Sequence, residues 1–468
     1  MRYGYVVNKY VPARILHAFA PLWRRFTLEK RDYREYLSFL ASSDLWSRER
    51  LLNFQWVAMR QLLLHCEEKV PFYRETWKDQ HINISDILCY KDLENLPILT
   101  KRDVREHTSS LIAYGVDERT LVKHETGGST GLPLVTYYDR TTELARLASS
   151  ERWNHYAGMT DFRQGLFFMG HAHSLLRDKK RWGDSGEKYF GTYFPLMYSG
   201  HLACTNLTDE VMSKYCDLLT RIKPRFLRGY TRGIYLLADY CYRRGREFDF
   251  LKAVMTSSEM LEPRQREITR AVWNCDIFDR YGMGEEVVTA SECQEHNGYH
   301  IDMVKSLVET VDEMGRQVWR ETGRIIGTSL TNFAMPLVRY DIGDLGELTE
   351  DSCPCGRQSQ MLSKIIGRRD DFILTPSGRR LTGAAFNQLA KGIPTIREYQ
   401  IVQRSVNRII VRITPTLDYD QCDEKKVFDF LRRQLEPAIE IGFEYLDFIP
   451  RQQSGKLRLI LSECQLTL

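Results

Sequence analysis

The spacing of hydrophobic residues predicts several helices in the first third of the chain. From Arg48 to Lys69, apolar residues recur with the period of a helix, and Val70-Pro71 ends the pattern. Residues 141–156 also have a helical composition. A proline-marked segment that begins at Leu96 predicts a further helix with Thr100 as its N-cap. This part of the chain therefore predicts a body built on core helices.

Short apolar runs in the middle of the chain predict strands that alternate with helices. The run at 165–170 is typical of a buried strand, and we assign no chemistry to His171 and His173, which follow it. Segments 223–230 and 251–263 have the pattern of a strand that passes into a loop, and each precedes a helical stretch. Strands that alternate with helices indicate an α/β fold.

A change of pattern at residues 365–371 predicts a division of the chain. Beyond it, we predict strands at 371–374, 399–403, 408–413 and 443–448 and an amphipathic helix at 424–435. We therefore predict a large N-terminal α/β domain, residues 1–367, and a small α+β C-terminal domain, residues 368–468. A chain of 468 residues with 43% hydrophobic content is long enough for two such cores.

A glycine-rich segment lies between a predicted strand that ends near His124 and a β-rich run that begins at Leu134. Glycines can turn their backbone N–H groups toward one point, and hydroxyl side chains add donors. The segment could therefore hold phosphates, or it could be an ordinary hairpin turn. It has neither the Gly-Lys-[Ser/Thr] ending nor the G-x-G-x-x-G spacing of two familiar nucleotide loops. Its central residues are Thr126, Gly127, Gly128, Ser129, Thr130 and Gly131.

Charge and cysteine content limit the classes of partner and compartment. The net charge is only +4, so no overall field points to nucleic acid. The 11 cysteines have no regular spacing, which is typical of free thiols in a reducing compartment. No segment approaches the roughly 18 to 20 apolar residues of a spanning helix. We expect a cytoplasmic protein.

The arginine- and aromatic-rich stretch at 11–27 could rest on an anionic membrane surface. Pro12 and Pro21 interrupt any long helix there, which favours packing on the chain's own domain. The sequence carries no indication of an oligomeric state.

Polar residues follow several predicted strands, and ligand sites of open α/β sheets lie outside the carboxyl ends of strands. Tyr281 could stack on a base, Glu285 could hold a hard cation, and Asp344 could accept hydrogen bonds from ribose hydroxyls. The alternatives are structural: an aromatic residue beside a glycine turn, and an Asp-rich turn. Other residues of these loops are Ser258, Glu259, Gly282 and Met283.

Four residues have the chemistry of a tetrahedral metal site. Three cysteines and one histidine offer three thiolates and an imidazole, which suit zinc in a closed, structural site. They are Cys293, His300, Cys353 and Cys355. His296 competes with His300 for the nitrogen position, and four unrelated residues remain the alternative.

Taken in order, these motifs resemble the adenylate-forming superfamily, in its phenylacetate-CoA ligase-like branch. The resemblance extends from about Arg48 to the end of the chain. It rests on Thr126–Pro133, Thr256–Leu261, Tyr281–Glu285, Tyr340–Asp344, Gly367–Asp371 and Ser454–Arg458, and the Cys3His set falls where members of this branch carry zinc.

The resemblance implies that a carboxylate attacks the α-phosphate of ATP to give an acyl-adenylate, and that the acyl group then passes to a thiol, amine or hydroxyl. It implies Lys456 as the catalytic lysine, whose ammonium neutralises both reacting anions. It also implies Glu285 on Mg²⁺, Ser129 and Thr130 on the phosphates, Tyr281 near adenine, and Asp344 and Arg368 on ribose. A mobile C-terminal domain would rotate about a hinge at Asp370. The cofactors implied are ATP, Mg²⁺ and structural Zn²⁺, with CoA as one acceptor.

Two departures bear on function. Gly284 stands where many members of the superfamily have Ser or Thr, and Leu132 stands where a basic residue is common. The extension at residues 1–47 resembles that of capsule or surface-polysaccharide relatives, which adds an acceptor on a sugar or lipid-linked intermediate and a peripheral membrane or glycan-assembly partner. The alternatives are adenylyl transfer to a hydroxyl and a nucleotide-binding scaffold without turnover.

Overall fold

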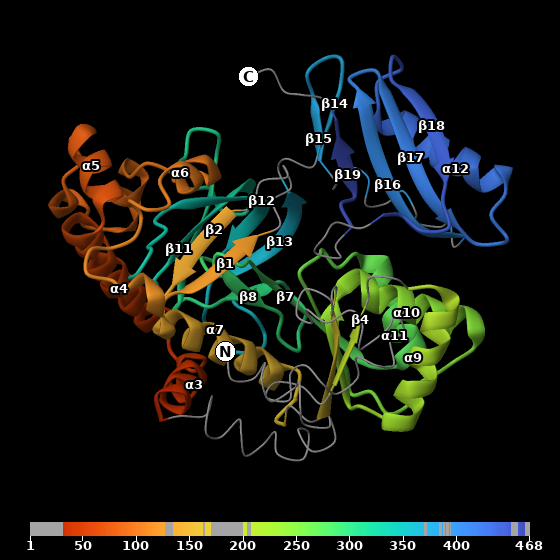
Figure 1. Ribbon diagram of the computed structural model, residues 1–468, viewed down its shortest axis with the longest axis horizontal. Helices are drawn as coiled ribbons and strands as arrows, with labels where there is room; N and C mark the ends of the chain where they lie inside the picture. The colour runs from red at the N-terminus through yellow and green to blue at the C-terminus, as the bar shows by residue number, and fades with distance from the viewer. Residues whose placement is uncertain are drawn as a thin grey trace.

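The structure is a computed structural model, and Figure 1 shows its arrangement. It describes residues 31–126, 134–161, 164–169, 200–203, 207–368, 372–382, 386, 389, 393, 395–450 and 457–463. The stretch at 11–27 and the histidines at 171 and 173 lie outside the described residues.

The helices near the N-terminus closely match those predicted from the sequence pattern. α4 covers Arg48–Lys69, and Pro71 opens the next helix, as a proline at the first helical position should. Thr100 forms the predicted cap, because its hydroxyl accepts from the Asp103 N–H and the Asp103 carboxylate accepts from the Thr100 N–H. The elements here are α3 (Arg31–Ser43), α4, α5 (Pro71–Asp79), η1 (Ile84–Asp86), η2 (Tyr90–Asn95), α6 (Lys101–Glu106) and η3 (Glu118–Thr120).

A sheet of 11 strands forms the centre of the large N-terminal part, in the order β10-β11-β12-β13-β9-β8-β7-β6-β5-β3-β4. The strands from β4 to β7 are parallel, and those from β7 to β10 are antiparallel. Their bounds are β3 (Gly165–Met169), β4 (Gly200–Ala203), β5 (Phe226–Tyr230), β6 (Ala253–Ser257), β7 (Asp276–Gly282), β8 (Thr289–Ser291), β9 (Tyr299–Ile301), β10 (Ser306–Val311), β11 (Thr322–Ser329), β12 (Tyr340–Thr349) and β13 (Met361–Arg368).

Helices cover both faces of the parallel half. Side chains alternate between the faces of a strand, so Leu227 and Val254 join the core under α9 (Asp209–Ile222), α10 (Thr231–Arg244) and α11 (Pro263–Trp273). Phe226 and Met255 point to the other face, where they pack with Trp153 of α7 (Arg140–Tyr156). This alternation of strand and helix confirms the predicted α/β class.

A two-stranded hairpin carries the glycine-rich segment. β1 (Val122–Thr126) and β2 (Leu134–Tyr138) pair antiparallel, and Thr126 faces Leu134. Asn332 fastens the hairpin to the body by donating to the Tyr137 carbonyl over 2.9 Å. The two ends of the segment at 127–133 are therefore held together.

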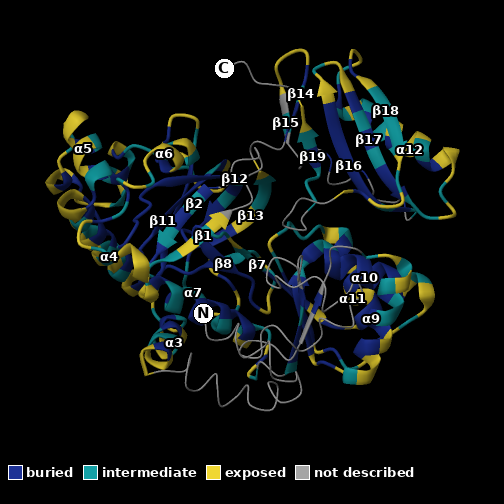
Figure 2. Ribbon diagram, viewed as in Figure 1, coloured by how far each residue is buried: buried dark blue, intermediate teal, exposed yellow. Residues whose placement is uncertain are grey.

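The C-terminal part has its own sheet, in the order β18-β17-β16-β19, and its own buried core. Figure 2 shows buried residues along the strands of this sheet. The elements are β14 (Phe372–Leu374), β15 (Arg380–Thr382), β16 (Ile396–Ser405), β17 (Arg408–Pro415), α12 (Gln421–Gln434), β18 (Glu440–Tyr445) and β19 (Ile460–Ser462). β13 runs to Arg368 in the large sheet, so the division that we predict between residues 367 and 368 falls at the end of this strand.

The two parts meet at the helices that follow β5 and β6. Arg232 of α10 forms an ion pair with Glu398 of β16 at 3.7 Å, and both side chains are largely buried. Arg264 of α11 donates to the Ile393 carbonyl over 3.3 Å. These contacts place the small C-terminal part beside the carboxyl ends of the parallel strands.

Within the described residues, none of the helices combines the length and the apolar character needed to cross a bilayer.

Candidate functional site

Glu259 joins three segments of the chain at the carboxyl end of β6. Its carboxylate accepts from the Arg232 N–H at the start of α10 over 3.0 Å. The same carboxylate accepts from the Leu457 N–H over 3.4 Å. Ser258, just before it, has a left-handed backbone with φ of 75°, a conformation that is uncommon for a residue with a side chain. The chain next to Lys456 is therefore tied to this strand end.

Tyr281, Asp344 and Arg368 form a connected group. The Tyr281 hydroxyl donates to Asp344 Oδ2 over 2.6 Å, and Arg368 Nε lies 3.1 Å from Asp344 Oδ1. The β12–β13 register makes Asp344 and Arg368 direct cross-strand neighbours, which explains the ion pair. Burial raises the pKa of Tyr281, and the Asp344 carboxylate adds to this effect, so the hydroxyl remains a donor. Residues predicted from separate motifs are thus in contact.

Glu285 is a buried carboxylate in the turn after β7, which ends at Gly282 and is followed by the half-buried Met283. The Tyr340 hydroxyl donates to its Oε1 over 3.4 Å. In the described part of the chain, no lysine or arginine forms an ion pair with Glu285, whereas the adjacent Glu286 pairs with Lys305. A buried carboxylate without a cationic partner suits a hard cation such as Mg²⁺.

The four residues of the Cys3His set lie close together in the structure, as the sequence predicted. The ligand atoms of Cys293, His300, Cys353 and Cys355 all lie within 4.8 Å of one another. The Cys293 and Cys353 sulfurs are 3.6 Å apart, and Cys355 Sγ is 3.3 Å from His300 Nε2. Zn–S bonds of about 2.3 Å and Zn–N bonds of about 2.0 Å in a tetrahedron would separate ligand atoms by roughly 3.4 to 3.8 Å. The set therefore fits a zinc ion.

The imidazole of this set is already oriented. His300 Nδ1 lies 2.8 Å from the Ser359 hydroxyl, which leaves Nε2 directed at the sulfurs. Burial lowers the pKa of His300 to about 4, so the ring is neutral, as a metal ligand must be. His296, the competing histidine, lies outside the set, with Nδ1 3.3 Å from Glu292.

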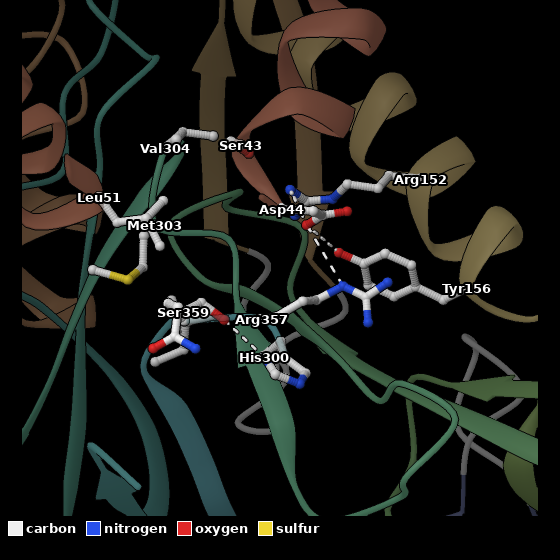
Figure 3. A pocket seen from close by; sticks show the side chains of 12 residues that line it. Ser43, Asp44, Leu51, Arg152, Tyr156, His300, Met303, Val304, Arg357 and Ser359 are labelled. Atoms are coloured by element: carbon white, nitrogen blue, oxygen red, sulfur yellow. Dashed lines mark hydrogen bonds and ion pairs between the residues drawn. The ribbon is translucent and has the colours of Figure 1, made fainter. Parts of the chain in front are cut away.

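A small cavity is lined by His300 on one side and by Ser43, the last residue of α3, and Asp44 on another (Figure 3). The Tyr156 hydroxyl donates to Asp44 over 2.6 Å, and the Arg357 guanidinium lies 4.0 Å from the centre of the Tyr156 ring. Arg152 pairs with Asp302 at 3.0 Å. Asp44 of the predicted N-terminal extension is therefore part of the same polar network as the loop that carries Cys353 and Cys355.

Several predicted residues lie outside the described residues: Gly127, Gly128, Ser129, Thr130, Gly131, Asp370 and Lys456. Thr126 closes β1, but its side chain is also outside the description.

Sequence reasoning gave no role to His124, although the residue stands two positions before Thr126. Its ring lies against Gly284, in the turn that carries Glu285. Burial lowers the pKa of His124, while Glu285 and Glu286 oppose the shift, so the ring is neutral at pH 7. The sequence also indicated no role for Tyr340 or Arg232. Their contacts, with Glu285 and Glu398, are between residues far apart in the sequence and become visible only in the fold.

Comparisons with known proteins give the chain relatives over most of its length. The family model described as CapK C-terminal domain matches residues 373–463. Phenylacetate-coenzyme A ligase of Thermus thermophilus is 27% identical over 368 residues, which is 76% of this chain and 79% of that protein. The enzyme of the same name from Pseudomonas putida is 24% identical and covers 71% and 73% of the two chains.

Among solved structures, 2-hydroxyisobutyryl-CoA ligase in the postadenylation state, with R3-HIB-AMP, has a TM-score of 0.66 at 18% identity, over 89% of both chains. The same ligase with 2-HIB-AMP and CoA in the thioesterification state has a TM-score of 0.55 at 19% identity, over 90% of this chain and 91% of that one. The fold is therefore shared with adenylate-forming ligases. The named relatives, the shared fold and the CapK-type match of the C-terminal part make the chain similar to the AMP-forming ligases of the adenylate-forming superfamily, in its phenylacetate-CoA ligase-like branch.

Proposed function

We propose that this protein activates a carboxylic acid with ATP and transfers the acyl group to a thiol, amine or hydroxyl. The observation that carries the proposal is the contact between Tyr281, Asp344 and Arg368, beside the buried Glu285, which forms no ion pair with a lysine or arginine that the structure describes. An aromatic ring, an acid for hydroxyls and a carboxylate for a metal are the groups that a bound nucleotide needs.

In the first step, a carboxylate oxygen of the acid attacks the α-phosphorus, and the bond to the bridging oxygen of pyrophosphate breaks. Both reactants are anionic, so the ammonium of Lys456 neutralises the charge that builds up between them. Asp344 accepts from the ribose hydroxyls, with Arg368 beside it, and the loop at 126–131 donates to the phosphates. Mg²⁺ held by Glu285 would supply further neutralisation of the phosphate charge.

In the second step, the acceptor attacks the acyl carbon and loses its proton, and AMP leaves. A thiol such as that of CoA is supported by the names of the relatives, which are CoA ligases. A role in surface-polysaccharide synthesis is supported by the CapK match at 373–463, and an amine or hydroxyl acceptor would belong to such a role. The hinge at Asp370 would exchange the faces that the C-terminal domain presents in the two steps.

The Cys3His set has a separate, structural role in this proposal. All four ligand positions are filled by protein atoms, so a zinc ion there has no open position for a substrate. The ion would tie the loop after β8 to the loop after β12.

Acid-dependent exchange of labelled pyrophosphate into ATP tests the first step. The panel of acids starts with phenylacetate and 2-hydroxyisobutyrate, which occur in the names of the relatives, and continues with fatty and amino acids. We expect exchange with at least one acid and its loss in Lys456→Ala. Exchange that persists in this variant would refute the role of Lys456.

Product analysis separates the remaining alternatives. Free AMP together with an acylated acceptor supports the proposal, whereas a product that carries AMP and no free AMP indicates adenylyl transfer to a hydroxyl. ATP binding without turnover across all acids and acceptors indicates a nucleotide-binding scaffold.

A further inference from the structure

The imidazole of His124 occupies the space that a side chain at position 284 would fill. A Cβ atom added to Gly284 would lie 1.9 Å from His124 Cε1, 2.6 Å from Nε2 and 2.7 Å from Nδ1. Real Cβ atoms do not approach other heavy atoms this closely, so even an alanine at 284 would displace the ring. Gly284 does not have a left-handed backbone, so its lack of a side chain matters here for space and not for conformation.

The backbone on either side of this contact is firmly placed. His124 lies in β1 opposite Thr136 of β2, and Asn332 fastens the hairpin to the body. Gly284 lies in the turn between β7 and β8, two strands that pair from Arg280 to Gly282. The β1–β2 hairpin, which carries the ring, and the β7–β8 turn, against which the ring packs, are therefore each fixed by their own contacts.

The nitrogens of the His124 ring also have hydrogen-bonding capacity that the described residues do not use. His124 Nδ1 is enclosed and has no hydrogen-bond partner among the described residues, whereas Nε2 is not one of the atoms that are both enclosed and without a partner. A neutral imidazole carries one N–H, and a proton on Nδ1 would be buried without an acceptor. The tautomer with the proton on Nε2 leaves only a lone pair at the enclosed Nδ1 and makes Nε2 the donor.

This donor is close in the sequence to the predicted phosphate contacts. His124 stands two residues before Thr126, where the glycine-rich segment begins, and Gly284 stands next to Glu285. We propose that His124 binds the nucleotide directly, donating an Nε2–H hydrogen bond to a phosphate oxygen of ATP, and that Gly284 is required because it leaves room for the ring. This inference rests on the proposed function for the identity of its ligand.

Calorimetric titration with MgATP alone tests the inference without a known acid. A hydrogen bond to a charged oxygen is worth about 1.5 to 3 kcal/mol, so we expect His124→Ala to weaken MgATP binding by about 10- to 100-fold. His124→Gln keeps an N–H donor at a similar reach, and we expect it to recover part of the affinity. His155→Ala, which removes an exposed histidine of α7, is the matched control and should bind like the wild type.

The dependence on Gly284 gives a second readout. Gly284→Ala should weaken MgATP binding by a similar factor, because its methyl group displaces the ring. The double variant His124→Ala/Gly284→Ala should bind no more weakly than either single variant, since there is then no ring to displace. Losses that multiply in the double variant would overturn the inference.

The melting temperature separates binding from folding, and His124→Ala should melt within a few degrees of the wild type. Unchanged MgATP affinity in His124→Ala would overturn the inference and leave the proposed function standing. Normal MgATP binding by the wild type without acid-dependent pyrophosphate exchange would instead contradict the proposed function alone.

Discussion

The residues of the Cys3His set all come from the large N-terminal part, whereas those of the candidate nucleotide site come from both parts of the chain. The four ligands of the set come from two loops and the strand β9 of the large part, lie largely buried, and are already within 4.8 Å of one another. The candidate nucleotide site draws Glu259 and Glu285 from the turns after β6 and β7 and Asp344 from within β12, not from the loop after a strand as the sequence predicted. It reaches the C-terminal part through Leu457. A closed set of this kind stabilises a fold, whereas a site divided between two parts can open and close.

The network around the two sites supports this distinction. Next to the set, Tyr156, Asp44 and Arg357 link a helix, the N-terminal segment and the metal loop through short contacts. At the candidate nucleotide site, the link between the two parts that the described residues show includes a few polar contacts, with Arg232–Glu398 as a largely buried pair. We therefore expect changes at the set to affect stability, and changes at the nucleotide site to affect activity with little effect on stability.

Removal of one metal ligand should have the largest effect. We expect wild-type protein to contain about one zinc per chain by elemental analysis, and Cys293→Ser to contain much less. Because an incomplete set leaves buried thiols without a metal, the variant should lose more than about 4 kcal/mol of unfolding free energy. Cys422→Ser in α12, an exposed free cysteine, is the control. A fully folded wild type without metal would contradict the zinc proposal.

Neutralisation of Glu285 should strongly reduce activity without weakening the fold. Glu285→Gln removes the carboxylate that we assign to Mg²⁺, and the exchange rate should fall by about 10²- to 10³-fold. The melting temperature should stay level or rise, since an unpaired buried charge is costly. A large loss of stability with a normal rate of pyrophosphate exchange would show that Glu285 serves the fold and not the activity, which contradicts the distinction between the two sites.

Loss of the buried pair between the two parts should have an intermediate effect. Arg232→Ala leaves Glu398, which is 3% exposed, without this partner, so we expect a loss of about 3 kcal/mol in the interaction between the parts. Limited proteolysis between residues 368 and 395 should become faster. Arg397→Ala, which removes a more exposed ion pair with Asp209 at 3.9 Å, should have little effect. Equal cleavage of both variants would argue against Arg232 as the main contact.

The smallest effect should come from the hydroxyl of Tyr281. Tyr281→Phe keeps the ring but removes the donor to Asp344, which still has Arg368 beside it. We expect the KM for ATP in the exchange assay to rise by less than about 10-fold, with kcat nearly unchanged. A kcat that falls more than the KM rises would show that the hydroxyl acts in the transition state.

The sequence predicted local elements well because their signals are local. Apolar spacing gave the bounds of α4, the hydroxyl of Thr100 gave a helix cap, and strand-helix alternation gave the α/β class. The order of residue types also selected the Tyr281, Asp344 and Arg368 group. It did not choose between His296 and His300, because that choice depends on how the segment after Cys293 folds: the His300 ring lies beside Cys355, whereas the His296 ring contacts Glu292.

The sequence by itself determined the types and approximate bounds of the elements and the chemistry that the motifs could support. Tertiary structure alone decided which distant residues touch: Glu285 with Tyr340, Arg232 with Glu398, and His124 with Gly284. The last pair is 160 positions apart, and no sequence pattern predicts that this glycine and this histidine are in contact. Their contact arises only when the hairpin docks on the large sheet, because packing across a fold depends on the arrangement of whole elements and not on the pattern within any one of them.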